Sequence, residues 1–170
     1  MLGCGQRVSQ LHLGGGTPTF LGDTGLSALM QMLRQNFRLL PGAELSIEVD
    51  PRTVSPARLQ CLAALGFNRL SLGVQDVDAG VQRAVQRIQP AEQVQALIAA
   101  ARRIGFEVID VDLIHGLPRQ TPGSFARTVG QVAGLRPDRI ALYAHLPQRF
   151  KRQRRIEQRE RFSCILHRPK

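Results

Sequence analysis

Short runs rich in β-branched and other apolar residues alternate along the chain with longer segments in which apolar residues recur every three or four positions. The first pattern is typical of strands and the second of amphipathic helices. Strands that alternate with helices along a whole chain indicate an α/β protein with a parallel sheet. The five predicted strands cover residues 9–13, 45–49, 69–74, 107–113 and 139–143.

Two of the predicted helices carry an apolar stripe that can cover a sheet. In the first, the stripe falls at i, i+3, i+4, i+7 and i+11, and it consists of Leu26, Leu29, Met30, Leu33 and Phe37. The second has similar spacing, with Val94, Leu97, Ile98, Ala101 and Ile104. Helix ends agree with this interpretation, because Ser55-Pro56 and Thr121-Pro122 place a capping hydroxyl before a first-turn proline. Gly66 and Gly105 can close helices.

Five βα units of this kind fit two architectures. One is an open doubly wound sheet, and the other is an incomplete barrel, since a full eight-unit barrel typically needs about 250 residues. Both architectures bind ligands at the carboxyl ends of the parallel strands. The strand ends are therefore the place to look for functional residues.

Polar residues and glycines collect at these ends. Gly14-Gly15-Gly16-Thr17 follows the first strand, and it matches neither GxGxxG nor a P-loop, which disfavours dinucleotides and nucleoside triphosphates. The glycine run alone is compatible with a tight turn or with a ligand loop. The ends of the next three strands carry Glu48, Asp50, Gln75, Asp76, Asp110, Asp112 and His115.

Each polar residue also has a structural interpretation when taken singly. Asp50 can cap a turn before Pro51, His115 can satisfy a backbone group, and Arg83 or Arg87 can be a surface charge. A shared rim nevertheless favours a polar ligand. An amine suits Glu48, vicinal hydroxyls suit Gln75 and Asp112, and a carboxylate suits Arg87.

Composition and charge narrow the class of protein. Apolar residues make up 43% and charged residues 21% of the 170 residues, as in a soluble globular domain. Apolar runs are far shorter than the roughly 18–20 residues needed to cross a bilayer, so we expect a cytoplasmic protein with no membrane contact. The three cysteines, Cys4, Cys61 and Cys164, are too far apart for a metal motif and are expected to be structural thiols.

The net charge of +10 is concentrated in residues 149–170, which hold nine Lys or Arg and two Glu. Residues 1–148 are therefore predicted to form the folded domain, and residues 149–170 a separate basic tail. A tail of this kind could bind nucleic acid, but it has no repeated aromatic platform for bases. We expect no specific nucleic-acid partner.

Five segments carry a family resemblance, which spans roughly residues 7–156. They are LHLGGGTPTFL, LSIEVDPRTV, LGFNRLSLGVQD, VDLIHGLPRQTPGSF and LRPDRIALYAHLPQRF. In order and spacing they resemble oxygen-independent coproporphyrinogen III oxidases of the radical SAM superfamily. The resemblance implies a partial radical SAM (β/α) barrel, a [4Fe-4S] cluster, S-adenosylmethionine and a porphyrinogen substrate that is decarboxylated to protoporphyrinogen IX. The implied S-adenosylmethionine contacts are Gly15, Gly16, Thr17, Glu48, Gln75, Arg87, Asp112 and Ala144.

The sequence departs from the family pattern in three respects. It lacks the cluster motif CxxxCxxC, and Cys4 has no neighbours at that spacing, so no metal ligand is assigned. Two residues that the family usually has before Ala144-His145 are missing. From about residue 157 the sequence reads as unrelated, as a shifted frame would produce.

We therefore expect an internal fragment of such an oxidase that is monomeric and inactive by itself, with no catalytic residue of its own. Two alternatives stay open. The first is a haem-binding relative resembling the haem chaperones, with His12, His115 or His145 as axial ligand. The second is a non-enzymatic binder of nucleic acid that uses the basic tail.

Overall fold

The computed structural model of the protein describes residues 5–145 and 164–167. Most of the predicted basic tail and Cys4 lie outside the described residues. The strands are β1 (Gln6–Leu13), β2 (Phe37–Val49), β3 (Arg69–Gln75), β4 (Val108–His115), β5 (Arg139–Ala144) and β6 (Cys164–His167). The helices are a 3-10 helix η1 (Pro18–Leu21), α1 (Gly22–Asn36), α2 (Pro56–Ala64), α3 (Ala79–Ala84), α4 (Ala91–Ile104) and α5 (Pro122–Gly134).

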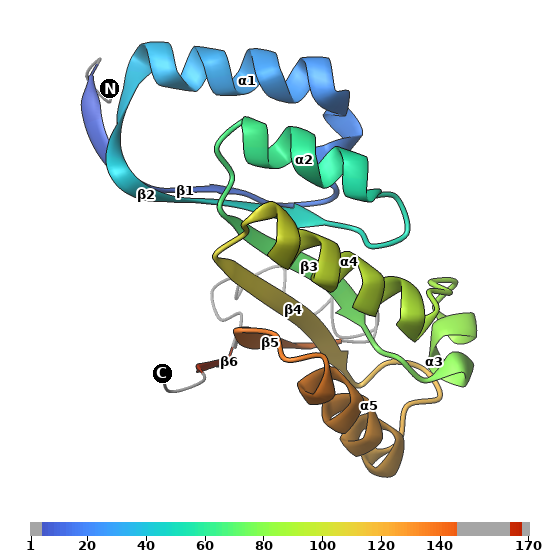
Figure 1. The fold of residues 1–170 in the computed structure, drawn as a ribbon. Coiled ribbons are helices and arrows are strands. Elements are labelled where there is room, and N and C mark those ends of the chain that lie inside the picture. Colours follow the sequence, from blue (N-terminus) through green and yellow to red (C-terminus); the bar gives the residue numbers. More distant parts are fainter. Residues whose placement is uncertain (1–4, 146–163, 168–170) are drawn as a thin grey trace, which may run out of the picture.

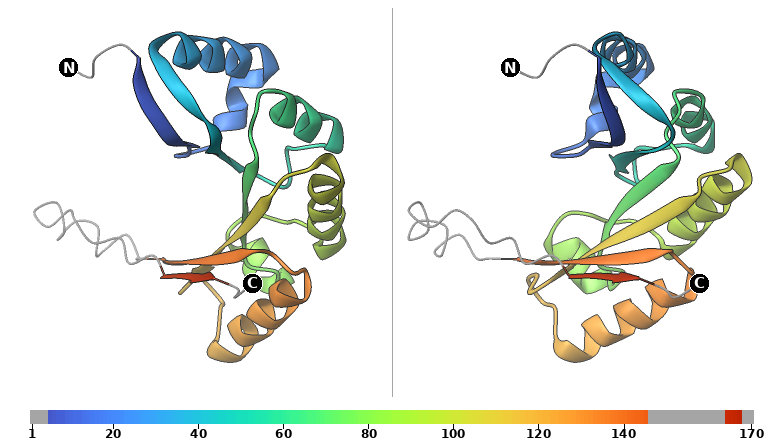
Figure 2. Two further views of the ribbon diagram at one scale, coloured as in Figure 1. Left: turned by 60° about the vertical axis from the view of Figure 1, so that its left-hand side comes forward. Right: turned by 90° about the vertical axis from the view of Figure 1, so that its left-hand side faces the viewer.

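The six strands form one sheet in the order β1-β2-β3-β4-β5-β6. Strands β1 to β5 are parallel to their neighbours, and β6 is antiparallel to β5. A doubly wound sheet reverses its strand order at a switch point, whereas here the order follows the chain. The helices lie on one side of the curved sheet (Figures 1 and 2). The fold is therefore a half-barrel of βα units, as the family resemblance implies.

All five predicted strands are confirmed, but β2 begins at Phe37 rather than at residue 45. The predicted apolar stripe of the first helix is confirmed at Leu26 and Met30, which are fully buried, and is wrong at Phe37. Helix α1 ends at Asn36, and Phe37 has the extended dihedrals φ −127° and ψ 144°. Pairing of Phe37 with Gln6 of β1 thus overrides the helical period.

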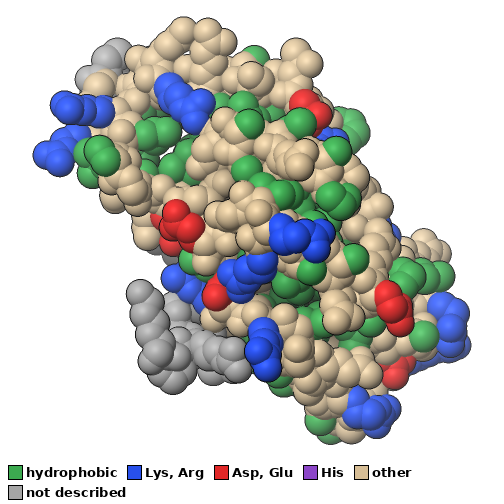
Figure 3. All heavy atoms as spheres, viewed as in Figure 1, with side chains coloured by type: hydrophobic (Ala, Val, Ile, Leu, Met, Phe, Trp, Pro, Cys, Tyr) green, Lys and Arg blue, Asp and Glu red, His purple; other side chains and the backbone are tan. Residues whose placement is uncertain are grey.

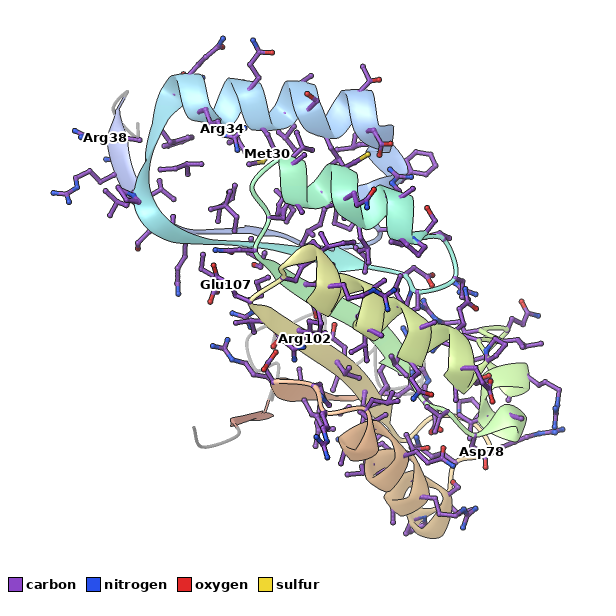
Figure 4. The ribbon with its side chains drawn as sticks, viewed as in Figure 1. Met30, Arg34, Arg38, Asp78, Arg102 and Glu107 are labelled. Atoms are coloured by element: carbon purple, nitrogen blue, oxygen red, sulfur yellow. The ribbon has the colours of Figure 1, made fainter. Side chains whose placement is uncertain are left out.

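The outer face of the sheet is apolar, and the helices cover it. Along each central strand, alternate residues point to opposite faces, and the buried outer side chains are Leu45, Ile47, Val49, Leu70, Leu72, Val74, Ile109, Val111 and Leu113. Met30 lies on the inner side of α1 (Figure 4), and α4 contributes Val94, Leu97, Ile98 and Ala101 to the same core. Because the helices cover the outer face, only the inner face and the ends of the strands remain accessible to a ligand.

The helix ends follow the predicted chemistry. The side chain of Ser55 accepts a hydrogen bond from the backbone N–H of Arg58, at 3.3 Å. Thr121 and Ser124 form a reciprocal capping box at the start of α5. Gly105 ends α4 with φ 106°, a left-handed conformation that glycine adopts without steric cost. Within the described part of the chain, no helix has the length and hydrophobicity of a transmembrane span.

Candidate functional site

A cavity of about 330 Å³ lies at the carboxyl ends of the parallel strands. Seven of the eight predicted contacts line it, and they come from the glycine loop, β2, β3, the segment after α3, and β4. The lining residues are Gly15, Gly16, Thr17, Glu48, Val49, Asp50, Gly73, Gln75, Arg87, Asp112, Ile114 and Tyr143. The structure thus brings to one concave site residues that are spread over almost the whole described chain.

Gly15 and Gly16 of the glycine loop form part of the cavity wall. Gly15 and Gly16 have φ values of 85° and 73°, which side chains rarely adopt. A Cβ atom on Gly14 would lie 2.4 Å from Nε2 of His12 and 2.7 Å from Oε1 of Glu48. The loop is therefore both a tight turn and part of the cavity, and Gly14 leaves room for the Glu48 carboxylate.

Glu48 is held between the loop and a histidine. Its Oε2 accepts the N–H of Gly15 at 3.0 Å, and its Oε1 lies 3.3 Å from Nε2 of His12. The other ring nitrogen of His12 lies 2.8 Å from Oγ of Ser46. Both nitrogens of this ring are thus engaged within the protein, so His12 is a poor axial ligand for haem. Its hydrogen bonds keep the partly exposed carboxylate in place.

Two arginines surround Asp50, whose position before Pro51 also suits a turn-capping role. Arg52 binds both carboxylate oxygens, with Nη2 2.6 Å from Oδ2, and Arg87 Nη2 lies 3.3 Å from the same oxygen. Burial acts to raise the pKa of Asp50, but the hydrogen bonds from Arg52 and the charge of Arg87 outweigh it, and the pKa lies below its usual value. Asp50 also accepts a hydrogen bond from the N–H of Arg52. It therefore caps the turn as well as pairing with the two arginines.

Arg87 is the cation of the cavity. It donates to the carbonyl of Gly73 at 3.2 Å, and burial lowers its pKa although Asp50 opposes this effect. An arginine stays protonated under all ordinary conditions. Its Nε is buried without an acceptor among the described residues. The Arg87 side chain also lines the cavity, so its guanidinium can meet an anionic ligand group there.

Asp112 lies on the wall between the cavity and the polar inner face of the sheet. Burial raises its pKa to about 6, with the negative charges of Glu48 and Asp110 adding to this effect and a hydrogen bond from Ser71 opposing it. The Ser71 hydroxyl donates to Oδ2 at 2.9 Å. The other carboxylate oxygen can accept a hydrogen bond from a ligand hydroxyl.

Ala144 is the one predicted contact that does not line the cavity. It is exposed at the end of β5, opposite His115 of β4. Tyr143 lines the cavity in its place, because adjacent residues of a strand point to opposite faces. Sequence reasoning missed Tyr143, because Ala144 was assigned from the family motif and not from the alternation of the strand.

No metal centre is formed by the described residues. Cys61 is free and exposed on α2, and within residues 5–145 and 164–167 no three His, Cys, Asp or Glu side chains are grouped so as to hold a metal. A [4Fe-4S] cluster needs thiolate ligands. The described residues thus fit S-adenosylmethionine, with its amine, carboxylate and hydroxyl groups, but do not fit the cluster.

The sequence model of the radical SAM superfamily matches residues 2–132. The chain therefore belongs to the radical SAM superfamily. Among its relatives, the oxygen-independent coproporphyrinogen III oxidase of Escherichia coli (strain K12) is 54% identical over 155 residues, which are 90% of this chain and 34% of that protein. The enzyme of the same name from Pseudomonas aeruginosa is 52% identical, over 89% of this chain and 34% of that protein.

Solved structures agree with these sequence relatives. The coproporphyrinogen III oxidase (HemN) of Escherichia coli, described as a radical SAM enzyme, superposes with a TM-score of 0.79 and 52% identity, covering 89% of this chain and 36% of that chain. Methylornithine synthase (PylB) superposes with a TM-score of 0.63 at 17% identity, over 84% of this chain and 40% of that one, and shares the fold alone. The chain spans about a third of the length of the curated relatives it matches.

Proposed function

We propose that this chain forms the S-adenosylmethionine-binding part of an oxygen-independent coproporphyrinogen III oxidase. The observation that carries the proposal is the single cavity at the strand ends, which gathers Gly15, Gly16, Thr17, Glu48, Gln75, Arg87 and Asp112. The identity of 54% to an oxidase of that name supports the particular enzyme.

Each group of the ligand has a matching protein group. The ligand's ammonium fits the carboxylate of Glu48, which Gly15 and His12 hold in place. Its carboxylate fits Arg87, and its ribose hydroxyls fit Gln75 and Asp112. Ala144 remains a predicted contact, although it lies outside the cavity lining.

Bound S-adenosylmethionine supplies, together with a reduced cluster, the hydrogen-atom abstraction that radical SAM enzymes use. The residues of this chain bind and orient the ligand and exclude water from one side of it. Decarboxylation of coproporphyrinogen III is proposed for the longer protein. For this chain alone we expect no decarboxylation, because its described residues offer no cluster ligands.

We further expect a cytoplasmic monomer that has no specific nucleic-acid site. On the face of the molecule that α2 and α4 form, Arg side chains are spread among Asp and Glu (Figure 3). A spread of this kind supports weak, salt-sensitive contacts with nucleic acid at most. Deleting the predicted tail, residues 149–170, tests the alternative, which requires salt-dependent binding that disappears with the tail.

Calorimetric titration tests the proposal. We expect saturable binding of S-adenosylmethionine to the full chain and much weaker binding of 5′-methylthioadenosine, which lacks the amine and carboxylate. Equal affinity for the two ligands, or no saturable binding, would overturn it. Anaerobic treatment with iron and sulfide should leave the chain without a cluster, and a stoichiometric brown cluster would contradict the assignment of no metal ligand.

A further inference from the structure

Gln75 has an unusual backbone for a residue of its type. Its φ is 66°, and the N–H of Asp76 donates across it to the carbonyl of Val74 at 2.8 Å. A hydrogen bond from residue i+2 to residue i across a residue with positive φ defines the rare, strained form of the γ-turn. The pairing of β3 with β4 shifts register between Gly73 and Gln75. Such strain persists only where the surroundings enforce it.

Two buried glutamines hold the residues on either side of this turn. Gln89 donates from Nε2 to the carbonyl of Val74, and Gln82 donates from Nε2 to the carbonyl of Asp76 at 3.0 Å. The glutamines also bind each other, because the N–H of Gln89 donates to Oε1 of Gln82 at 3.1 Å and Nε2 of Gln82 donates to the carbonyl of Gln89 at 3.0 Å. Gln82 is 5% exposed and Gln89 is 2% exposed, so water does not compete for these hydrogen bonds.

The side chain of Asp76 connects the turn to α5 and to the segment that precedes it. It is 2% exposed, and its Oδ1 accepts from the hydroxyl of Thr128 on α5 at 2.6 Å and from the N–H of Asp78 at 2.8 Å. Its Oδ2 accepts from Nε2 of Gln120 at 2.5 Å. Asp78 in turn caps α3 through the N–H groups of Gly80 and Val81 (Figure 4).

The backbone of Gln82 also holds Arg87. The N–H of Arg87 donates to the carbonyl of Gln82 at 2.9 Å, and its guanidinium returns to the carbonyl of Gly73 at 3.2 Å. The segment from the turn at Gln75 to Arg87 is thus tied back to Gly73, two residues before Gln75. Gln75 and Arg87 are thus linked through Gly73, which lines the cavity, and through Gln82, which does not.

We infer that four buried side chains and one half-buried side chain, that of Gln120, form a polar clamp, which holds the strained turn so that Gln75 and Arg87 meet the ligand in a fixed geometry. The members of the polar clamp are Asp76, Gln82, Gln89, Gln120 and Thr128. They are positioning residues, because none of them lines the cavity. The inference rests on the proposed function for the identity of the ligand, but the holding of the turn can be tested without it.

A merely structural network would stabilise the fold without setting ligand affinity. The clamp predicts more, since loss of one bond lets the backbone of Gln75 relax to negative φ and turns its side chain away from the cavity. Gln89→Met is the sharpest change, because it removes the donor to Val74 and at the same time removes Oε1, which has no partner among the described residues. Little net destabilisation is therefore expected.

The matched control is Gln93→Met. Gln93 also donates from Nε2 to a backbone carbonyl, that of Pro51, at 3.0 Å, but it is not part of the clamp. We expect Gln89→Met to weaken S-adenosylmethionine binding by calorimetry about 10-fold, the effect of losing roughly one hydrogen bond. Gln93→Met should bind like the wild type. If Gln89→Met does not fold, Thr128→Val takes its place, with the same expected loss.

Amide hydrogen exchange of Asp76, followed by NMR in the absence of ligand, separates the two proposals. We expect exchange about 10-fold faster in Gln89→Met at an unchanged urea midpoint, because the N–H that closes the turn is released. Unchanged exchange would overturn the clamp, and faster exchange with unchanged affinity would overturn its positioning role. If the wild-type chain binds no S-adenosylmethionine, the proposed function fails, while the exchange rates still decide whether the clamp holds the turn.

Discussion

Gly15 donates its backbone N–H to Oε2 of Glu48 at 3.0 Å, across 33 residues of sequence. This bond joins the glycine loop after β1 to the end of β2. It presents a carboxylate at the cavity before any ligand is present, so that binding need not pay to order it. The site of this radical SAM protein is in this respect preorganised.

Glu48→Gln removes the negative charge and keeps the size of the side chain. We expect S-adenosylmethionine affinity to fall at least about 10-fold, since a charge-assisted bond to the ligand ammonium is worth roughly 1.5–3 kcal/mol. Glu44→Gln on the same strand is the control, because Glu44 pairs with Arg69 and does not line the cavity. Calorimetry on both variants checks this, and equal losses would speak against a ligand role for Glu48.

Gly14→Ala forces a Cβ atom to within 2.4 Å of Nε2 of His12 and 2.7 Å of Oε1 of Glu48. We expect a loss of about 1–3 kcal/mol in the free energy of unfolding, as for other overpacked sites, together with weaker ligand binding because Glu48 is displaced. Gly130→Ala, on the open surface of α5, should instead stabilise by up to about 1 kcal/mol. Urea unfolding of the two variants gives the comparison, and a harmless Gly14→Ala would refute the described packing.

Asp112 gives the stability a pH dependence through its raised pKa of about 6. The folded state binds this proton more tightly than the unfolded state, so the contribution is full below pH about 4 and is lost as the pH rises through 6. Asp112→Asn keeps an acceptor for Ser71 and cannot ionise. Its stability relative to the wild type should therefore rise by about 2 kcal/mol between pH 4.5 and pH 7.5.

Urea midpoints at the two pH values measure this difference. The opposite order, with Asp112→Asn losing more stability at pH 7.5 than at pH 4.5, would mean that the ionised carboxylate is the form that folding favours. Asp112→Asn should also weaken S-adenosylmethionine binding at pH 7.5, where the wild-type carboxylate accepts from the ribose hydroxyls.

Arg69 carries the ion pairs of the inner face of the sheet, with Nη1 2.5 Å from Oε1 of Glu44 and Nη2 2.5 Å from Oδ2 of Asp110. The Asp110 side chain is only 6% exposed, and burial raises its pKa although Arg69 opposes this. Arg69→Met leaves a buried carboxylate with a lost partner, and we expect about 3–5 kcal/mol of destabilisation at pH 7.

The control for this pair is Arg102→Met on α4 (Figure 4). It breaks an exposed ion pair of 2.6 Å with Asp138, which also accepts the N–H of Ile109 near the start of β4. Exposed pairs contribute about 0–1 kcal/mol. Adding Asp110→Asn to Arg69→Met should recover part of the loss, because the unpaired charge is then absent. Equal losses for the two arginine variants would show that the inner-face pair is no more important than a surface pair.

Much of the fold was predictable because its signals are local. The strand positions, the caps at Ser55 and Thr121 and the closing role of Gly105 depend on neighbouring residues, and all are confirmed. The start of β2 was not predictable from its own residues, since Phe37 continues a helical stripe until its pairing with β1 decides otherwise.

The sequence by itself determined the order of βα units, the superfamily and the residue types at the strand ends, because these follow from periodicity and short motifs. Only the tertiary structure decided that Tyr143 rather than Ala144 lines the cavity and that Gln75 adopts φ 66°. The hydrogen bond from Thr128 to Asp76 spans 52 residues. Side-chain contacts over such separations, and the backbone strain they sustain, depend on the packing of the whole fold and leave no periodic signal in the chain.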